Sequence, residues 1–113
     1  MTIEERIGNA LLVFGDPVTK EPFVPLPGEN PDRYYTIRVS TVPLLPADNA
    51  PQYDECYVLV HFICPYSYDY VERAALTKKA LFDAGCTWPS MEDGIDDGQK
   101  DIIFECRIPQ VIE

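Results

Sequence analysis

The stretch that decides the fold is Tyr-Asp-Glu-Cys-Tyr-Val-Leu-Val-His-Phe-Ile-Cys at residues 53–64, followed by Pro65 and by a helical pattern that ends at Gly85. Side chains alternate between the two faces of a strand, and here both faces are largely apolar. One face carries Cys56, Val58, Val60, Phe62 and Cys64, and the other carries Tyr57, Leu59, His61 and Ile63. This pattern predicts a strand at the centre of a sheet, or a strand whose second face is covered by a partner.

A helix is predicted directly after this strand, between Asp69 and Gly85. Asp69 and Glu72 have the spacing of a capping box, and a glycine commonly ends a helix. The apolar residues expected to form the buried stripe of this helix are Val71, Ala74, Ala75, Leu81 and Phe82. The charged residues expected on its outer side are Glu72, Arg73, Lys79 and Asp83.

The residues before this unit predict one helix and one strand. Thr2 and Glu5 fit a second capping box, and Gly15 before an Asp-Pro pair is a helix stop. The buried face of this first helix is expected to carry Ile3, Ile7, Leu11 and Phe14. Residues 16–32 and 42–51 are rich in proline and are expected to be loops, while residues 33–40 alternate as a strand does.

The residues after Gly85 predict two strands joined by an acidic turn. Residues 86–91 are a short strand candidate, and residues 92–100 have the composition of a turn throughout. Residues 102–108 alternate again, and Pro109 is expected to end that strand.

The order of these elements predicts an α+β fold of helix-strand-strand-helix-strand-strand. Two helices are expected to pack on one face of a mainly antiparallel four-stranded sheet. A chain of 113 residues is long enough for one core, so residues 1–113 are expected to form a single domain.

The charge and the composition exclude several classes of function. A net charge of −10 disfavours direct binding to nucleic-acid phosphates and to anionic membranes. No apolar run approaches the ~20 residues that span a bilayer, and no secretion signal is visible at the N-terminus. The four cysteines are therefore expected to be reduced thiols in a cytosol. Their spacing lacks the short pairs of a zinc site, and buried thiols are the expected state.

No catalytic or metal-binding motif is complete in this sequence. The turn with Asp93, Asp96, Asp97 and Asp101 does not fit a calcium-binding loop, because Ile95 and Phe104 fill ligand positions. The single histidine, His61, lies among apolar neighbours, where a packing or interface role is expected. We therefore expect no enzyme activity, no cofactor and no bound metal. An enzyme would require His61 to meet two or more carboxylates.

The seven tyrosines instead favour an interaction protein. Tyrosine combines apolar area with a polar tip, and it is enriched at protein interfaces. The residues expected at an interface are Tyr34, Tyr57, His61, Tyr66 and Tyr68.

Ordered blocks along the chain carry a resemblance to a known family. The blocks are Phe-Gly-Asp-Pro-Val (14–18), Arg-Tyr-Tyr-Thr (33–36), Ala-Asp-Asn (47–49), Val-Leu-Val-His-Phe (58–62), Leu-Phe-Asp-Ala-Gly (81–85) and Ile-Ile-Phe-Glu-Cys (102–106). In this order, over nearly the whole chain, the sequence resembles the small tail-completion, or tail-terminator, proteins of long-tailed phages and prophages of Gram-positive bacteria. No single block is specific, and no catalytic residue carries over.

The resemblance implies a mechanical role in the virion. Such proteins form a ring, typically a hexamer, at the head-proximal end of the tail tube, and the ring stops tube growth and offers a head-joining surface. The implied partners are further copies of the chain, the tail-tube protein and a head-completion or connector protein. DNA would pass through without specific binding, and assembly would take place in the host cytoplasm. The acidic residues implied at the lumen or rim are Asp54, Asp93, Asp96 and Asp97.

Two alternatives remain open from the sequence. The first is another component of the head–tail neck, which fold and charge barely distinguish from a tail terminator. The second is a small binding or regulatory module outside viruses, which would be a stable monomer or dimer with a defined pocket.

Overall fold

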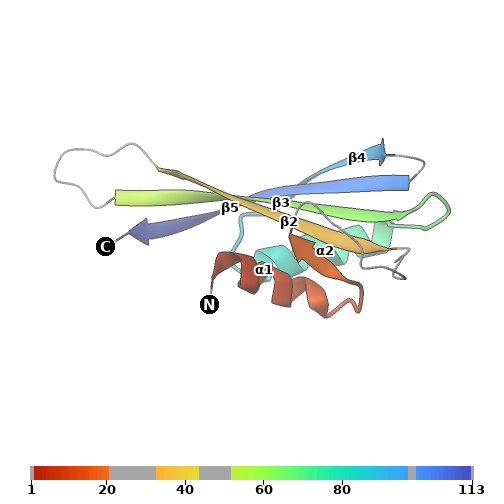
Figure 1. Cartoon of the computed structure of the whole chain (residues 1–113), viewed down its shortest axis with the longest axis horizontal. Coiled ribbons are helices and arrows are strands. Elements are labelled where there is room, and N and C mark those ends of the chain that lie inside the picture. Colours follow the sequence, from red (N-terminus) through yellow and green to blue (C-terminus); the bar gives the residue numbers. More distant parts are fainter. Residues whose placement is uncertain (1, 21–32, 44–51, 97–98, 113) are drawn as a thin grey trace.

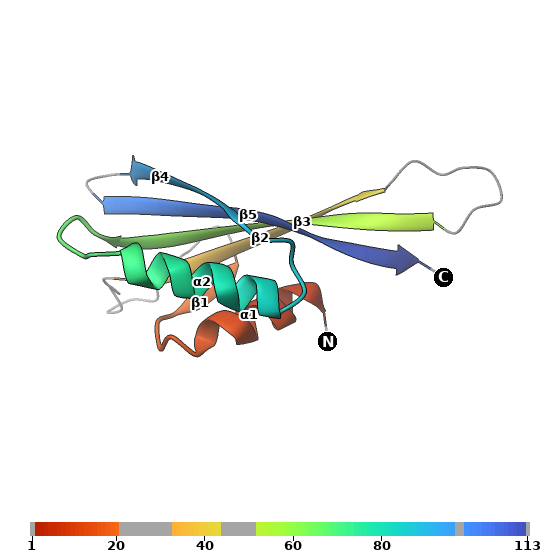
Figure 2. The ribbon, with the colours of Figure 1, turned by 180° about the vertical axis from the view of Figure 1, so that it is seen from behind.

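The computed structural model describes residues 2–20, 33–43, 52–96 and 99–112, which form two helices and five strands. The elements in chain order are α1 (Ile3–Leu12), β1 (Val18–Lys20), β2 (Tyr34–Pro43), β3 (Gln52–Pro65), α2 (Val71–Asp83), β4 (Ser90–Asp96) and β5 (Gln99–Ile112). The strands form one sheet in the order β1-β2-β3-β5-β4. Both helices lie against the same face of this sheet, and the other face is turned away from them (Figure 1, Figure 2).

The expected four-stranded, mainly antiparallel sheet is wrong, because the sheet has five strands and is mixed. The additional strand, β1, lies in the segment expected to be a loop and pairs in parallel with β2, with Val18 opposite Tyr35. The carbonyl of Pro17 also accepts a hydrogen bond of 2.8 Å from the Tyr35 N–H. Three residues between prolines are too short to show a strand period, so this strand depends on its neighbour.

The expected boundaries near the C-terminus are also wrong. Residues 92–96 continue β4 instead of forming a turn, and Asp93 lies opposite Ile102 of β5. β5 continues through Pro109 to Ile112 instead of ending at residue 108. Pro109 lies beyond Glu105, where the pairing of β5 with β4 ends, so one side of β5 is an edge of the sheet there. Proline is tolerated at such an edge because its missing N–H can face away from the neighbouring strand.

The central strand was predicted correctly. β3 pairs antiparallel with β2 on one side and with β5 on the other, from Gln52 opposite Ile112 to Pro65 opposite Gln99. The end of β2, the start of β3 and the end of β5 project together beyond the helices (Figure 1). The molecule is 53 Å long.

The core lies between the sheet and the two helices. Thr2 caps α1 as expected, because its hydroxyl accepts the Glu5 N–H at 3.1 Å, and Ile7 and Leu11 are fully buried. The sheet contributes the predicted inner faces of its long strands: Tyr35, Ile37, Cys56, Val58, Val60, Phe62, Cys64, Ile102, Phe104, Cys106 and Ile108.

The expected buried stripe of α2 is only partly correct. Ala74 and Leu81 are buried, but Val71 and Phe82 are 68% and 51% exposed, and Thr77 is buried in their place. The Thr77 hydroxyl is satisfied there, since it donates to the Arg73 carbonyl at 2.7 Å. The expected capping box is also wrong: Tyr70 is the N-cap, and the Asp69 carboxylate accepts the Val71 N–H at 3.2 Å.

Candidate interaction surface

The most distinctive surface is the side of the sheet that faces away from the helices, which we call the open face (Figure 2). Strand alternation and the observed register determine which residues of its three central strands lie on this face. Among them are Tyr34, Thr36, Arg38, Ser40, Tyr57, Leu59, His61, Ile63, Asp101, Ile103, Glu105 and Arg107. No helix within the described ranges covers this face.

The centre of the open face is apolar. Tyr34 lies opposite Ile63 across β2 and β3, and His61 lies opposite Ile103 across β3 and β5. Next along the sheet, Leu59 lies between Arg38 and Glu105, and these three residues help to line a depression of about 270 Å³. An apolar centre with a charged margin has the composition of a protein–protein interface.

His61 pairs with Asp101 on this face. The distance from His61 Nδ1 to Asp101 Oδ1 is 2.8 Å, and the two side chains are 19% and 17% exposed. The contact is diagonal, because Asp101 lies opposite Ile63 and His61 lies opposite Ile103. A carboxylate that hydrogen-bonds to one ring nitrogen fixes the orientation of the imidazole.

Sequence reasoning assigned Asp101 to the solvated turn and so missed this pair. The signal was present, because the alternation of Ile103 and Glu105 continues back by two residues to Asp101. The pairing of β3 with β5 supplied the missing information.

The predicted interface residues are divided between two sites. Tyr34, Tyr57 and His61 share the open face, where the Arg107 guanidinium lies 5.6 Å from the centre of the Tyr57 ring. Tyr68 instead packs against the core, with its ring 6.0 Å from that of Phe62. Tyr66 is exposed beyond the end of β3 and lines a separate hollow.

The predicted acidic residues do not form one cluster within the subunit. Asp54 lies opposite Gln110 in the projecting end of the sheet, while Asp96 lies opposite Gln99 at the other end. Asp93 accepts a hydrogen bond from the Tyr70 hydroxyl at 2.5 Å, and Asp97 lies outside the described residues.

The cysteines are buried as the sequence predicted, and all four are free thiols. Cys86 and Cys106 hydrogen-bond to each other, and this bond together with burial raises the pKa of the Cys106 thiol. Burial likewise raises the pKa of the Cys64 thiol. The protonated, unreactive form of Cys64 and Cys106 is therefore favoured, whereas the hydrogen bond with Cys106 lowers the pKa of the Cys86 thiol.

The open face offers contact area and fixed polar groups. Within residues 2–20, 33–43, 52–96 and 99–112, no three His, Cys, Asp or Glu side chains converge on a possible metal position. In the same ranges, no helix is long and apolar enough to cross a membrane.

In comparisons with known proteins, neither a family model nor a curated sequence matches this chain.

Proposed function

We propose that this protein is a ring subunit at the head-proximal end of a phage tail tube, where it stops tube growth and provides the head-joining surface. The resemblance of the ordered blocks motivates the proposal. The observation that carries it is the open face, which no described helix covers and whose central strands carry Leu59, Ile63 and Ile103.

The first block of the resemblance forms one structural unit. The Phe14 ring lies under the Arg73 guanidinium at 5.0 Å, and Asp16 accepts a hydrogen bond from Arg73 at 2.5 Å. Gly15 adopts a φ of +84°, which turns the chain out of α1. Phe14, Gly15 and Asp16 therefore hold the turn that follows α1 against α2.

The projecting end of the sheet has two edges suited to ring formation. In the described part of the chain, β1 pairs with β2 only at Tyr35, Thr36 and Ile37, and β4 pairs with β5 only as far as Glu105. The outer edges at residues 38–43 and 108–112 therefore have no strand partner among the described elements. Unpaired strand edges readily add another strand.

These two edges belong to different strands, so a contact between β5 of one copy and β2 of the next would be heterologous. Repeated heterologous contacts build a ring when the rotation closes. Tyr57 and Leu59 of the open face lie opposite Ser40 and Arg38, so they would lie beside this contact and could be covered by the neighbouring subunit. A net charge of −10 would keep the ring from retaining DNA that moves through it.

The test uses the tail-tube protein encoded nearest to the gene for this chain. Tube protein is polymerised with and without the chain, and tube lengths are measured by electron microscopy and light scattering. The proposal predicts shorter tubes with a ring at one end. Unchanged tube lengths, with a chain that stays monomeric beside the tubes, would overturn the proposal. The oligomeric state of the chain without tubes does not decide between these outcomes, because a ring can require the tube as its template.

The same experiment distinguishes a tail terminator from another neck component. A terminator acts on tube length in the absence of any head protein. A neck component would leave tube length unchanged and would bind only when the head connector is added.

A further inference from the structure

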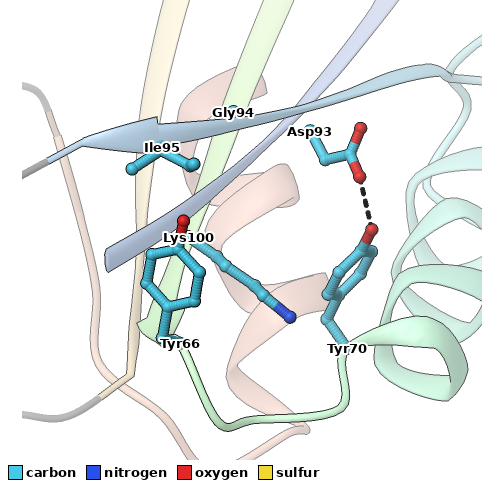
Figure 3. Close-up of a pocket in the computed structure, with 6 residues that line it drawn as sticks. All are labelled: Tyr66, Tyr70, Asp93, Gly94, Ile95 and Lys100. Carbon is cyan, nitrogen blue, oxygen red and sulfur yellow. Dashed lines mark hydrogen bonds between the residues drawn. The ribbon is translucent and has the colours of Figure 1, made fainter. Parts of the chain in front are cut away.

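A second candidate site lies on the helix side of the sheet, beyond the N-terminal end of α2. It is a hollow of about 460 Å³ lined by Tyr66, Tyr70, Asp93, Gly94, Ile95 and Lys100 (Figure 3). β4, the start of β5 and the 66–70 turn contribute these residues, so the β4–β5 pair meets a turn that lies more than twenty residues earlier in the sequence. The hollow shares no residue with the open face.

One wall of the hollow holds a fixed carboxylate. The Tyr70 hydroxyl donates to Asp93 Oδ2 at 2.5 Å, as the dashed line in Figure 3 marks. This hydrogen bond raises the pKa of the Tyr70 hydroxyl, because the ionised phenolate would face the carboxylate. Tyr70 thus orients Asp93 and leaves the second carboxylate oxygen able to accept from a ligand.

The hollow already holds a cation from the chain itself. The Lys100 ammonium lies 5.0 Å from the centre of the Tyr70 ring, within the range of a cation–π interaction. Figure 3 shows the Lys100 side chain extending into the space between Tyr66 and Tyr70. The chemistry of the walls is therefore suited to a positive charge over an aromatic ring.

Two exposed apolar side chains flank this cation position. Tyr66 is 51% exposed and Ile95 is 69% exposed, and both line the hollow. The surrounding sequence is acidic, with Asp69 and Glu92 exposed nearby along the chain, and the protein has a net charge of −10. A ligand with an apolar stem and a positive head is complementary to this combination.

We propose that the hollow binds an arginine side chain presented by a partner protein. The guanidinium plane stacks on the exposed Tyr66 ring and donates to Asp93, while the methylene stem packs on Ile95. Lys100 competes for the same position and moves into solvent when arginine enters. The proposal is independent of the ring role, because it uses a different surface and needs no second copy of the chain.

The test is a nuclear magnetic resonance titration of the full chain with a blocked Gly-Arg-Gly tripeptide. The control ligand is the same tripeptide with citrulline, which is nearly isosteric with arginine and carries no charge. Saturable shifts are expected at the amides of Tyr66, Gly94 and Ile95 with the arginine peptide, and much weaker shifts with citrulline. Equal binding of both peptides, or no saturable shift with arginine, would overturn the proposal.

Two matched substitutions on β4 test the role of the carboxylate. Asp93→Asn is expected to weaken arginine binding about tenfold, because a charge-assisted hydrogen bond is lost. Glu92→Gln removes the same charge from the next residue, which points to the opposite side of the strand, and should change the affinity less than about twofold. Equal losses of affinity in the two variants would show that only the overall negative charge matters, and this result would contradict a specific site at Asp93.

Lys100→Met distinguishes a cation site from an anion site. The competition predicts that this variant binds the arginine peptide several-fold more tightly than the natural chain. If the lysine were instead the ligand-binding group, the same variant would lose binding, and the proposal would be wrong. A chain that binds arginine but leaves tail tubes uncapped would retain this inference and reject the ring function.

Discussion

The Arg73 guanidinium donates a hydrogen bond of 2.5 Å to the Asp16 carboxylate, and each side chain is only 13% exposed. Arg73 also lies over the Phe14 and Phe62 rings, so one side chain joins α2, the turn after α1 and the sheet. Removing one member of a mostly buried ion pair leaves the other charge without compensation.

The first prediction compares the two arginines that face Asp16. Arg73→Gln should lower the free energy of unfolding by about 2–4 kcal/mol, because it leaves the mostly buried Asp16 carboxylate with only the longer contact to Arg33. Arg33 is 39% exposed and lies 3.7 Å from the same carboxylate, so Arg33→Gln is the matched control. Its expected cost is below about 1 kcal/mol, as for surface ion pairs. Urea unfolding checks both values, and equal losses would contradict the central position of Arg73.

The second prediction concerns the buried Tyr35 hydroxyl. Its oxygen lies 2.9 Å from Thr77 Oγ1, and because Thr77 already donates to the Arg73 carbonyl, Tyr35 is the donor. Tyr35→Phe should therefore cost about 1–2 kcal/mol of unfolding free energy at neutral pH.

The cost of Tyr35→Phe should also depend on pH. Burial raises the pKa of Tyr35 above its ordinary value of 10.0, so the unfolded chain loses this proton first as the pH rises. Stability from the protonated hydroxyl is fully present below pH 10 and is lost above it. The difference in unfolding free energy between the natural chain and Tyr35→Phe should therefore shrink as the pH rises above 10.0 in urea unfolding. A difference in unfolding free energy that stays constant as the pH rises would show that burial does not raise the pKa of Tyr35.

The third prediction concerns the four thiols. All are buried, and burial favours the protonated form of Cys64 and Cys106, so a disulfide reagent should react slowly with the folded chain. Urea should make all four react at once. Ala75 is exposed on α2, so Ala75→Cys supplies a reactive reference thiol in the same protein. A natural cysteine that reacts as fast as this reference would contradict the described core.

The fourth prediction is a pair of glycine substitutions with opposite signs. Gly8 lies inside α1, and a Cβ there would meet only the Ile37 side chain at 3.9 Å, so Gly8→Ala should stabilise the chain by about 0.5–1 kcal/mol. Gly15 has a φ of +84°, so Gly15→Ala should destabilise the chain by about 1 kcal/mol although no atom lies nearby. Thermal unfolding distinguishes the two, and changes of the same sign would contradict the backbone described for one of them.

The sequence predicted the elements whose own pattern was strong. The two-faced apolar run of β3 and the capped, periodic α1 were both predicted, because each contains its signal within a dozen residues. β1 was missed, since three residues between prolines form a strand only by pairing with β2. Arg73 was wrongly assigned to the outer side of α2, and Thr77 was not included in its buried stripe, because the polar groups that make their burial acceptable come from other elements.

The interaction surface was predictable only in part. The second apolar face of β3 was expected to mark a central strand or to be covered by a partner, and Tyr34, Tyr57 and His61 lie on this face of the sheet. The His61–Asp101 pair and the hollow around Asp93 required the register of β5 with β3 and β4, which no local pattern specifies.

Tube capping by two charged variants measures whether the open face is a contact between ring subunits, as we propose. Leu59→Arg places a charge at the apolar centre of the open face, and Ala75→Arg places the same charge on the exposed side of α2. Both variants should unfold within a few degrees of the natural chain, about the shift expected for surface changes. If the open face is a contact between subunits, Leu59→Arg should leave tail tubes as long as tubes without the chain, while Ala75→Arg should shorten and cap them as the natural chain does. Capping by Leu59→Arg at the natural level would contradict this proposal.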